Sequence, residues 1–163
     1  MINPDRLSLL TAALRSDRFQ QGHGHLTINP GLPTEKNCCL GVACIVAMEN
    51  GLQLDYVDLD TRMYLDDEGH TCGTDGDDLT ICGCYTNDTV LPRAVVDWYG
   101  FPDEDPDMIA PMRDGDGGTY EARHSASSYN DDLGFDFAGI ADAFDSNFTN
   151  TAEMEDPSGR LEP

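Results

Sequence analysis

Basic residues are scarce in this 163-residue sequence. Lysine and arginine total 9 against 31 aspartates and glutamates, the formal net charge is -22, and Lys36 is the only lysine. Such a negative surface repels DNA, RNA and anionic membranes, so we expect no direct nucleic-acid binding and no membrane partner. Three explanations of the acidity remain open: a salt-rich host cell, a need for a cation, and a DNA mimic that presents carboxylates in place of phosphates.

Apolar residues are also few, at 39% of the chain without glycine, against the roughly 45–50% usual for soluble domains, a figure that also counts glycine. No run reaches the ~18 residues of a membrane span, and residues 1–16 lack the pattern of a secretory signal. We therefore expect a cytoplasmic protein, in the host cytoplasm if it is viral. Without export, the six cysteines are better explained as reduced thiols, metal ligands or core residues than as disulfides.

The length favours one compact domain over residues 1–148, followed by an acidic tail at 149–163 that has little to bury and is expected to be flexible. One long apolar segment lies at residues 38–48, and the core must form around it. Asn37 is placed to cap a helix there, and Asn50 with Gly51 is placed to end it. This predicts a central helix over residues 38–50, buried on every side.

The predicted fold class is α+β, with about four helices around the buried central helix and a small antiparallel sheet or hairpins. The first outer helix begins at the cap Asn3 and ends near Ser16. Another lies between Pro92 and Gly100, and a last one follows the cap Asp136. Within the central helix, Gly41 costs about 1 kcal/mol relative to alanine, so we expect another backbone to pass close to it.

Shorter segments are expected to form strands and loops. Residues 25–28 and 53–65 have the composition of short strands, and residues 70–85 resemble a hairpin around the turn 74–77. Residues 103–118 are acidic and rich in proline and glycine, which predicts a mobile loop.

Several short segments, which follow one another in order along most of the chain, carry a resemblance to known proteins. They are Ala13-Leu14-Arg15-Ser16, Phe19 with Gln21-Gly22-His23-Gly24, Cys38-Cys39-Leu40-Gly41-Val42-Ala43-Cys44, Leu91-Pro92 with Val95 and Trp98-Tyr99-Gly100, and Asn130-Asp131-Asp132-Leu133-Gly134 with Phe137 and Ile140-Ala141-Asp142. Together they resemble a family of small uncharacterised proteins of tailed viruses and prophages. The resemblance implies a viral accessory gene and no particular substrate. The acidic segment 55–88 has no counterpart in it.

The two adjacent cysteines lead to one alternative function, a cysteine hydrolase. If Asn37 caps the central helix, Cys38 and Cys39 occupy its first turn, where the helix dipole and the free amides favour a thiolate. The competing explanation is that both are core residues, since free cysteine is among the most buried residue types. The catalytic set would be Cys38 or Cys39 with His124 and Asn130 or Asp131, and with Gln20 or Gln21 as oxyanion donor.

A second cluster of possible ligands lies on the expected hairpin. His70 and Cys72 are on one arm, and Cys82 and Cys84 are on the other. Residues two apart on a strand face the same side, and tetrahedral zinc accepts a set of three cysteines and one histidine. This spacing predicts a structural zinc site, although packed or exposed thiols would explain it as well.

Polar residues recur where the glycine loop near residue 21, the start of the central helix and the turn at 130–132 would meet. They are Gln21, His23, Cys38, Asn130 and Asp131. A binding site needs only such a concave polar cluster, whereas an enzyme also needs a nucleophile and a base within about 3 Å. We therefore expect a viral-type accessory protein that acts as a non-catalytic binding module for a host protein or small ligand, with counter-defence as one role. The alternatives are the cysteine hydrolase and the acidic DNA mimic.

Overall fold

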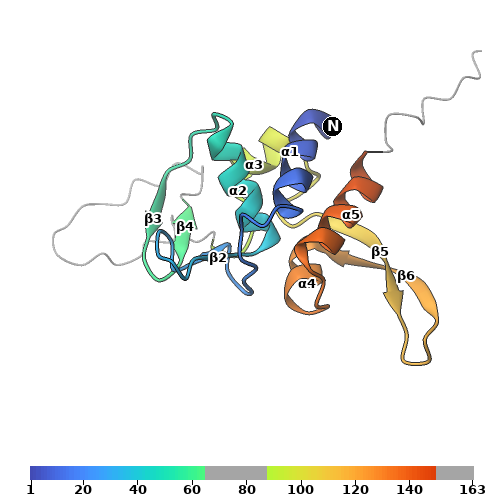
Figure 1. Ribbon diagram of the computed structural model, residues 1–163. Coiled ribbons are helices and arrows are strands. Elements are labelled where there is room, and N and C mark those ends of the chain that lie inside the picture. Colours follow the sequence, from blue (N-terminus) through green and yellow to red (C-terminus); the bar gives the residue numbers. More distant parts are fainter. Residues whose placement is uncertain (65–87, 150–163) are drawn as a thin grey trace, which may run out of the picture.

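The computed structural model describes residues 1–64 and 88–149. Over these residues the chain forms five helices and three antiparallel two-stranded sheets, so the predicted α+β class is confirmed (Figure 1). The helices are α1 Pro4–Leu14, α2 Cys39–Glu49, α3 Arg93–Tyr99, α4 Ala126–Asp131 and α5 Phe137–Phe148. The sheets pair β1 Thr27–Ile28 with β2 Lys36–Asn37, β3 Tyr56–Asp58 with β4 Arg62–Tyr64, and β5 Asp107–Arg113 with β6 Thr119–Ser125.

Two predicted features lie outside the described residues: the hairpin at 70–85 and the tail from residue 150. Among the helices of the described ranges, none is long and apolar enough to cross a membrane.

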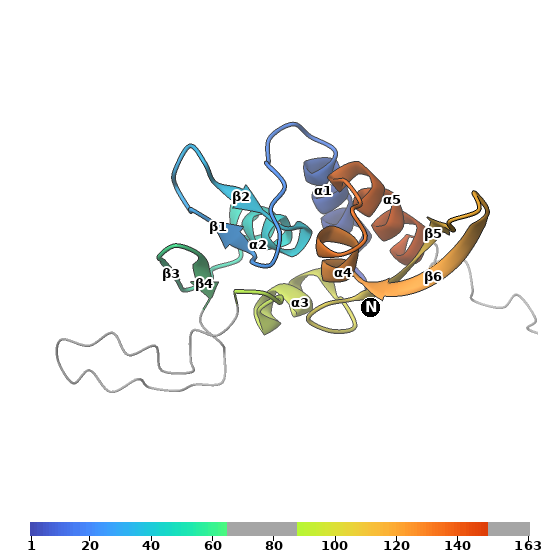
Figure 2. The same ribbon diagram turned by 90° about the horizontal axis from the view of Figure 1, so that it is seen from below.

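The helix α2 lies at the centre of the fold. The hairpins β1–β2 and β3–β4 are on one side of it and α1 is on the other (Figures 1 and 2), and it also packs against α3 and α4. Apart from Ile45 and Met48, which are partly exposed, and Glu49 at its end, the helix is buried. A helix without a polar face is stable only inside a core, so the prediction of a helix buried all round is confirmed in substance.

The prediction that Asn37 caps α2 is wrong. The N-cap is Cys38, whose Sγ accepts a hydrogen bond from the backbone N–H of Gly41 at 3.4 Å. Asn37 is held in β2 instead, where the hydroxyl of Thr27 donates to its Oδ1 at 2.7 Å. Strand pairing therefore outweighs the capping preference of this asparagine, and the helix begins one residue later.

Another backbone does pass close to Gly41, as predicted. A Cβ added to Gly41 would lie 1.7 Å from the carbonyl oxygen of Leu26. The same carbonyl accepts a hydrogen bond from the N–H of Cys38 at 3.1 Å. The segment before β1 is thus fixed against the first turn of α2, at a distance that only glycine permits.

Isolated bridges connect the small strands beside α2. Gln21 pairs with Asn37 on β2, and Ile28 on β1 pairs with Thr61 just before β4. The loop after α1, β2, β1 and the start of β4 therefore lie next to one another. This patch of extended chain carries several of the polar residues described below.

Three helices follow the sequence prediction closely. Asn3 accepts a hydrogen bond from the N–H of Arg6 at 3.1 Å and caps α1, which ends at Leu14. The helix α3 ends at Gly100, whose φ of 77° is left-handed. Asp136 caps α5 by accepting from the N–H of Gly139 at 2.8 Å. These helices were predictable because their capping signals are local.

The prediction of a mobile loop over residues 103–118 is wrong. Its middle part, residues 107–113, is β5, which pairs with β6 from Asp107 opposite Ser125 to Arg113 opposite Thr119. The helix α4 follows β6 directly and was not expected either. Tyr129 of α4 anchors the hairpin, because its hydroxyl donates to the carbonyl of Ala122 at 2.7 Å. Pairing and packing against α4 therefore order a segment whose composition favours a loop.

Candidate functional site

The three segments predicted to meet at a site do lie together, with Asn130 at their centre. Its side chain is fully buried. Its Oδ1 accepts hydrogen bonds from Nε2 of Gln21 at 3.1 Å and from the backbone N–H of Cys39 at 3.3 Å. Its Nδ2 donates to the carbonyl of Gly22 at 2.7 Å and to Oδ1 of Asp131 at 2.6 Å. The amide is thus satisfied from within the protein.

His23 and Asp131 lie at the outer side of this Asn130 network. Nδ1 of His23 is 2.9 Å from the carbonyl oxygen of Asn130 and 3.6 Å from Oδ1 of Asp131. The side chain of His23 is 61% exposed and that of Asp131 is 27% exposed. Oδ2 of Asp131 also accepts from the N–H of Gly24 at 3.0 Å. These contacts fasten the glycine loop to the end of α4.

The cysteines at the start of α2 are buried and poorly ionised. Cys38 is 3% exposed and Cys39 is fully buried. Burial raises the pKa of Cys38 to about 12 and raises the pKa of Cys39 as well. On the basis of the helix dipole, the sequence predicted lowered pKa values for these thiols. Removing a thiolate from water, however, costs more free energy than the amides of the first turn contribute. Cys44, further along α2, is also buried with a raised pKa.

The other members of the catalytic alternative are engaged elsewhere. Cys39 donates its S–H to the carbonyl of Ala126 at 3.4 Å, and Gln21 donates to the carbonyl of Phe135 at 2.8 Å. The ring of His124 lies edge-on to Tyr129 with centroids 5.8 Å apart. Within residues 1–64 and 88–149, no hydrogen bond or ion pair joins His124 to a cysteine. The geometry therefore lacks the contact between nucleophile and base that a thiol hydrolase requires.

The four predicted zinc ligands, His70, Cys72, Cys82 and Cys84, lie outside the described residues. In the part of the chain that is described, no group of three or more His, Cys, Asp or Glu side chains is arranged to hold a metal ion. The zinc site therefore stays a prediction from spacing.

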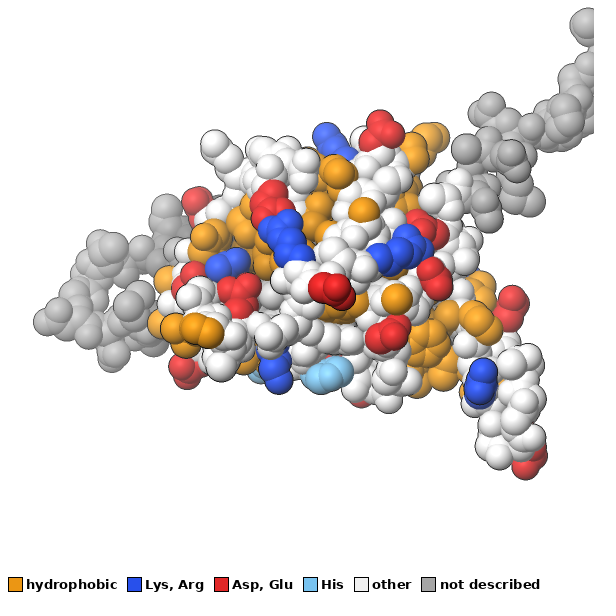
Figure 3. All heavy atoms as spheres, viewed as in Figure 1, with side chains coloured by type: hydrophobic (Ala, Val, Ile, Leu, Met, Phe, Trp, Pro, Cys, Tyr) orange, Lys and Arg blue, Asp and Glu red, His pale blue; other side chains and the backbone are white. Residues whose placement is uncertain are grey.

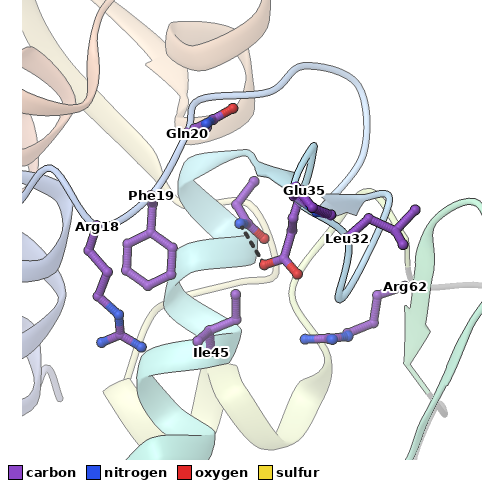
Figure 4. A pocket seen from close by; sticks show the side chains of 9 residues that line it. Arg18, Phe19, Gln20, Leu32, Glu35, Ile45 and Arg62 are labelled. Atoms are coloured by element: carbon purple, nitrogen blue, oxygen red, sulfur yellow. Dashed lines mark hydrogen bonds between the residues drawn. The ribbon is translucent and has the colours of Figure 1, made fainter.

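A hollow of about 370 Å³ opens beside α2, on the patch where the extended segments meet (Figure 4). Its charged lining residues are Arg18 from the loop after α1, Glu35 from the β1–β2 hairpin and Arg62 from β4. Its apolar lining residues are Phe19, Leu32, Pro33 and Ile45. The sequence did not predict this site, because its residues come from four separate segments that share no motif.

The charged groups in the hollow are held in place by partners. Arg62 is only 12% exposed, and its Nε donates to Oδ1 of Asp58 at 2.8 Å. Its guanidinium also lies 4.5 Å from the ring centre of Tyr56 and points across the hollow toward Ile45 (Figure 4).

Arg18 donates to both carboxylate oxygens of Glu49, and its guanidinium lies 4.7 Å from the ring centre of Phe19. Glu35 accepts from the N–H of Gly31 at 2.7 Å and from Nδ2 of Asn37 at 3.3 Å. The hollow is therefore pre-organised rather than formed by loose side chains.

The surface charges are dispersed on the face seen in Figure 3. Acidic side chains lie among basic and apolar side chains there, and they do not follow one elongated edge. A DNA mimic needs carboxylates in a row at phosphate-like spacing, so this face lends no support to that alternative.

The described fold and its hollow define a small α+β protein with a buried central helix. A family model described as a domain of unknown function, DUF8296, matches residues 7–148, and the chain belongs to this family. The match extends from α1 to the end of α5 and so includes the hollow and the Asn130 network. No curated protein and no solved structure matches the chain.

Proposed function

We propose that this protein is a non-catalytic binding module, of the viral accessory kind that the sequence resemblance implies, and that it takes a small ligand bearing a carboxylate in the hollow beside α2. The observation that carries the proposal is the pair of arginines, Arg18 and Arg62, that line this hollow in a chain with a net charge of -22.

The size of the hollow suits a small ligand. Its volume of about 370 Å³ lies near the lower end of the roughly 300–1,000 Å³ of typical ligand sites. Phe19, Leu32 and Ile45 offer apolar contacts and Gln20 offers polar ones, whereas the buried amide of Asn37 is bonded to Thr27 and Glu35. A compact molecule with an apolar body and one charged end fits this lining.

The charge of the hollow favours an anionic end. Among the described residues, two of the nine basic residues of the chain line it, against one acid, Glu35. Both arginines also pair with an acid beside the lining, Arg18 with Glu49 and Arg62 with Asp58. Arg62 is largely desolvated and held by Asp58, so a ligand gains a hydrogen bond without having to order a free side chain.

The lining also supports binding rather than catalysis. Among the residues that the structure describes, the lining contains no cysteine, serine, threonine, lysine or histidine, the residue types that most often serve as nucleophile or neutral-pH base. Its one carboxylate, Glu35, is occupied by two hydrogen bonds. A ligand in the hollow would therefore be held without being changed.

The test compares matched acids and amides. Backbone amide NMR spectra of the full chain are recorded while N-acetyl-leucine or N-acetyl-leucinamide is added, together with a panel of small carboxylic acids and their amides. We expect acids to shift the resonances of residues 18–37 and Arg62, and to bind at least fivefold more tightly than their amides. Equal binding of acids and amides, or shifts confined to other segments, would refute the proposal.

Variants locate the binding site. Arg62→Gln and Arg18→Gln each remove one positive charge from the hollow and should weaken acid binding at least threefold. Arg93→Gln is the matched control, because Arg93 forms a similar ion pair with Asp97 but lies on the exposed surface of α3. Acid binding that falls equally in all three variants would show a general charge effect instead of a site.

A further inference from the structure

The β5–β6 hairpin has one covered edge. Asn147 of α5 binds β5 at Ile109, whose N–H donates to Oδ1 of Asn147 at 2.9 Å and whose carbonyl accepts from Nδ2 at 2.9 Å. In Figure 2, β5 accordingly lies between α5 and β6. The outer edge of β5 is therefore closed at this point by the same chain.

The edge of β6 is free. In an antiparallel pair, two directly opposite residues point their N–H and C=O groups either both toward each other or both away from each other. Ile109 points these groups outward to Asn147, so Arg123, which lies opposite it, points its own N–H and C=O away from β5. Glu121, two residues before Arg123, also points its N–H and C=O away from β5. It lies opposite Pro111, which has no N–H. In the described ranges no hydrogen bond reaches the backbone of Glu121 or Arg123. An edge of this kind is a template for another strand.

We propose that this edge pairs with β6 of a second copy of the chain, which joins the two hairpins into one antiparallel sheet about a two-fold axis. The sequence of β6 is complementary to itself in one register. With Ala122 opposite Ala122, Glu121 faces Arg123 of the other copy, and Arg123 faces its Glu121. The same register sets Tyr120 against His124 and Thr119 against Ser125.

The directions of the backbone N–H and C=O groups agree with this register. Glu121 and Arg123 are the residues whose N–H and C=O point outward, so each opposed pair can exchange both of its hydrogen bonds. Ala122, at the two-fold axis, directs its backbone groups inward to Ala110 and needs no new partner. A shift of one residue would oppose outward groups to inward ones and lose the ladder.

Side chains add to the pairing. Directly opposite residues share a face of the sheet, so the two Glu121–Arg123 pairs lie on the outer face, where opposite charges across strands stabilise. Tyr120 is 51% exposed in the single chain, and His124 of the second copy would cover part of its ring. The proposal uses a different surface from the hollow and does not rest on the proposed function.

Net charge opposes the association and makes it salt-dependent. Each copy carries a formal charge of -22, and the repulsion between two such bodies extends over a Debye length of about 10 Å at 0.1 M salt but only about 3 Å at 1 M. The contacts at the edge, at hydrogen-bond distances of about 3 Å, are much shorter than the Debye length at 0.1 M and comparable with that at 1 M, so salt screens the long-range repulsion more than it weakens the contacts. Dimerisation should therefore strengthen at least tenfold between 0.1 M and 1 M NaCl.

The test is sedimentation equilibrium on the full chain, from micromolar to near-millimolar concentration at both salts. Glu121→Arg and Arg123→Glu each oppose like charges twice across the axis and should weaken the dimer at least tenfold. The double variant exchanges the charges and should restore it to within about threefold. Arg113→Glu is the control, because it makes the same charge change on β5, away from the edge of β6.

A second variant tests the backbone ladder. Arg123→Pro removes an outward N–H that makes no hydrogen bond in the described part of the chain, so the monomer should keep its far-ultraviolet circular dichroism while the dimer is lost. A chain that stays monomeric at 1 M salt refutes the proposal, and so does a dimer that survives Glu121→Arg. Failure of the double variant to recover refutes the register, and a monomer whose edge binds another protein assigns it to a different partner.

Discussion

The carbonyl oxygen of Leu26 occupies the position that a side chain on Gly41 would need. Gly41→Ala should therefore destabilise the fold by about 3 kcal/mol or more, because backbone on both sides must move to admit one methyl group. Urea unfolding followed by circular dichroism measures the change.

Gly115→Ala is the matched control. A Cβ at Gly115, in the turn between β5 and β6, meets no atom within 4 Å, so the free energy of unfolding should change by less than about 0.5 kcal/mol. Equal unfolding midpoints for the two variants would show that the segment before β1 yields easily, and the close approach would then not constrain the fold.

Asn130→Ala should cost about 2–4 kcal/mol, because it leaves the carbonyl of Gly22, the N–H of Cys39 and the amide of Gln21 without their partner in a buried place. Thermal and urea unfolding measure the loss. Gln20→Ala removes a side-chain amide that makes no hydrogen bond within the described part of the chain, so it should be nearly neutral. An equally small effect of Asn130→Ala would mean that water replaces the network.

The buried thiols should resist alkylation in the folded protein. Cys38, Cys39 and Cys44 are buried with raised pKa values, so each should react with iodoacetamide at pH 7 at least a hundredfold more slowly than a free cysteine peptide. Mass spectrometry of the digested protein reads each site separately, and prior unfolding in guanidinium is the positive control. Fast modification of Cys38 alone would revive the hydrolase alternative.

Stability should fall at alkaline pH. The folded pKa of Cys38 is about 12, above the roughly 8.5 of an unfolded thiol. Its contribution is therefore complete below about pH 8.5 and is lost as pH rises toward 12, because only the unfolded state releases the proton in that window. The slope is at most about 1.4 kcal/mol per pH unit for this group.

The variant Cys38→Ser keeps a cap acceptor but does not ionise. Its free energy of unfolding, measured in urea with reductant at pH 7.5, 8.5 and 9.5, should fall less steeply than that of the parent chain above pH 8.5. Parallel curves would contradict the assignment of this slope to Cys38.

The spacing of His70, Cys72, Cys82 and Cys84 predicts about one zinc per chain after extensive dialysis, measured by elemental analysis. The double change Cys72→Ser with Cys82→Ser should abolish it, because two ligands are lost. His124→Ala should leave it unchanged. A dialysed chain without zinc would remove the prediction.

Local signals explain what the sequence could predict. The caps Asn3 and Asp136, the stop at Gly100 and the apolar spacing of α1 and α5 act within one or two helical turns, so they hold whatever the rest of the chain does. The meeting of Gln21 with Asn130 was also predictable, because polar residues recurred beside the expected core.

The features that the sequence does not predict depend on contacts between distant segments. The composition around β5 predicts a loop, because Pro111 and the acidic residues at 103–107 and 114–116 are poor strand formers. Pairing with β6 and the clamp by Asn147 outweigh that preference. Cys38 was not recognised as a cap because sulfur is a weak acceptor. The hollow had no signal at all, since Arg18 and Arg62 become neighbours only when the chain has folded.

The burial of α2 has a consequence for the order of folding. A helix with no polar face has no stable place on the surface of a half-formed core, and its neighbours α1, α3 and α4 come from both sides of it in the chain. Its docking must wait until distant segments have been brought together, which slows folding. Until then the apolar segment from Cys39 to Ala47 is exposed to solvent in an otherwise strongly charged chain. Aggregation is therefore most favoured during this stage of folding.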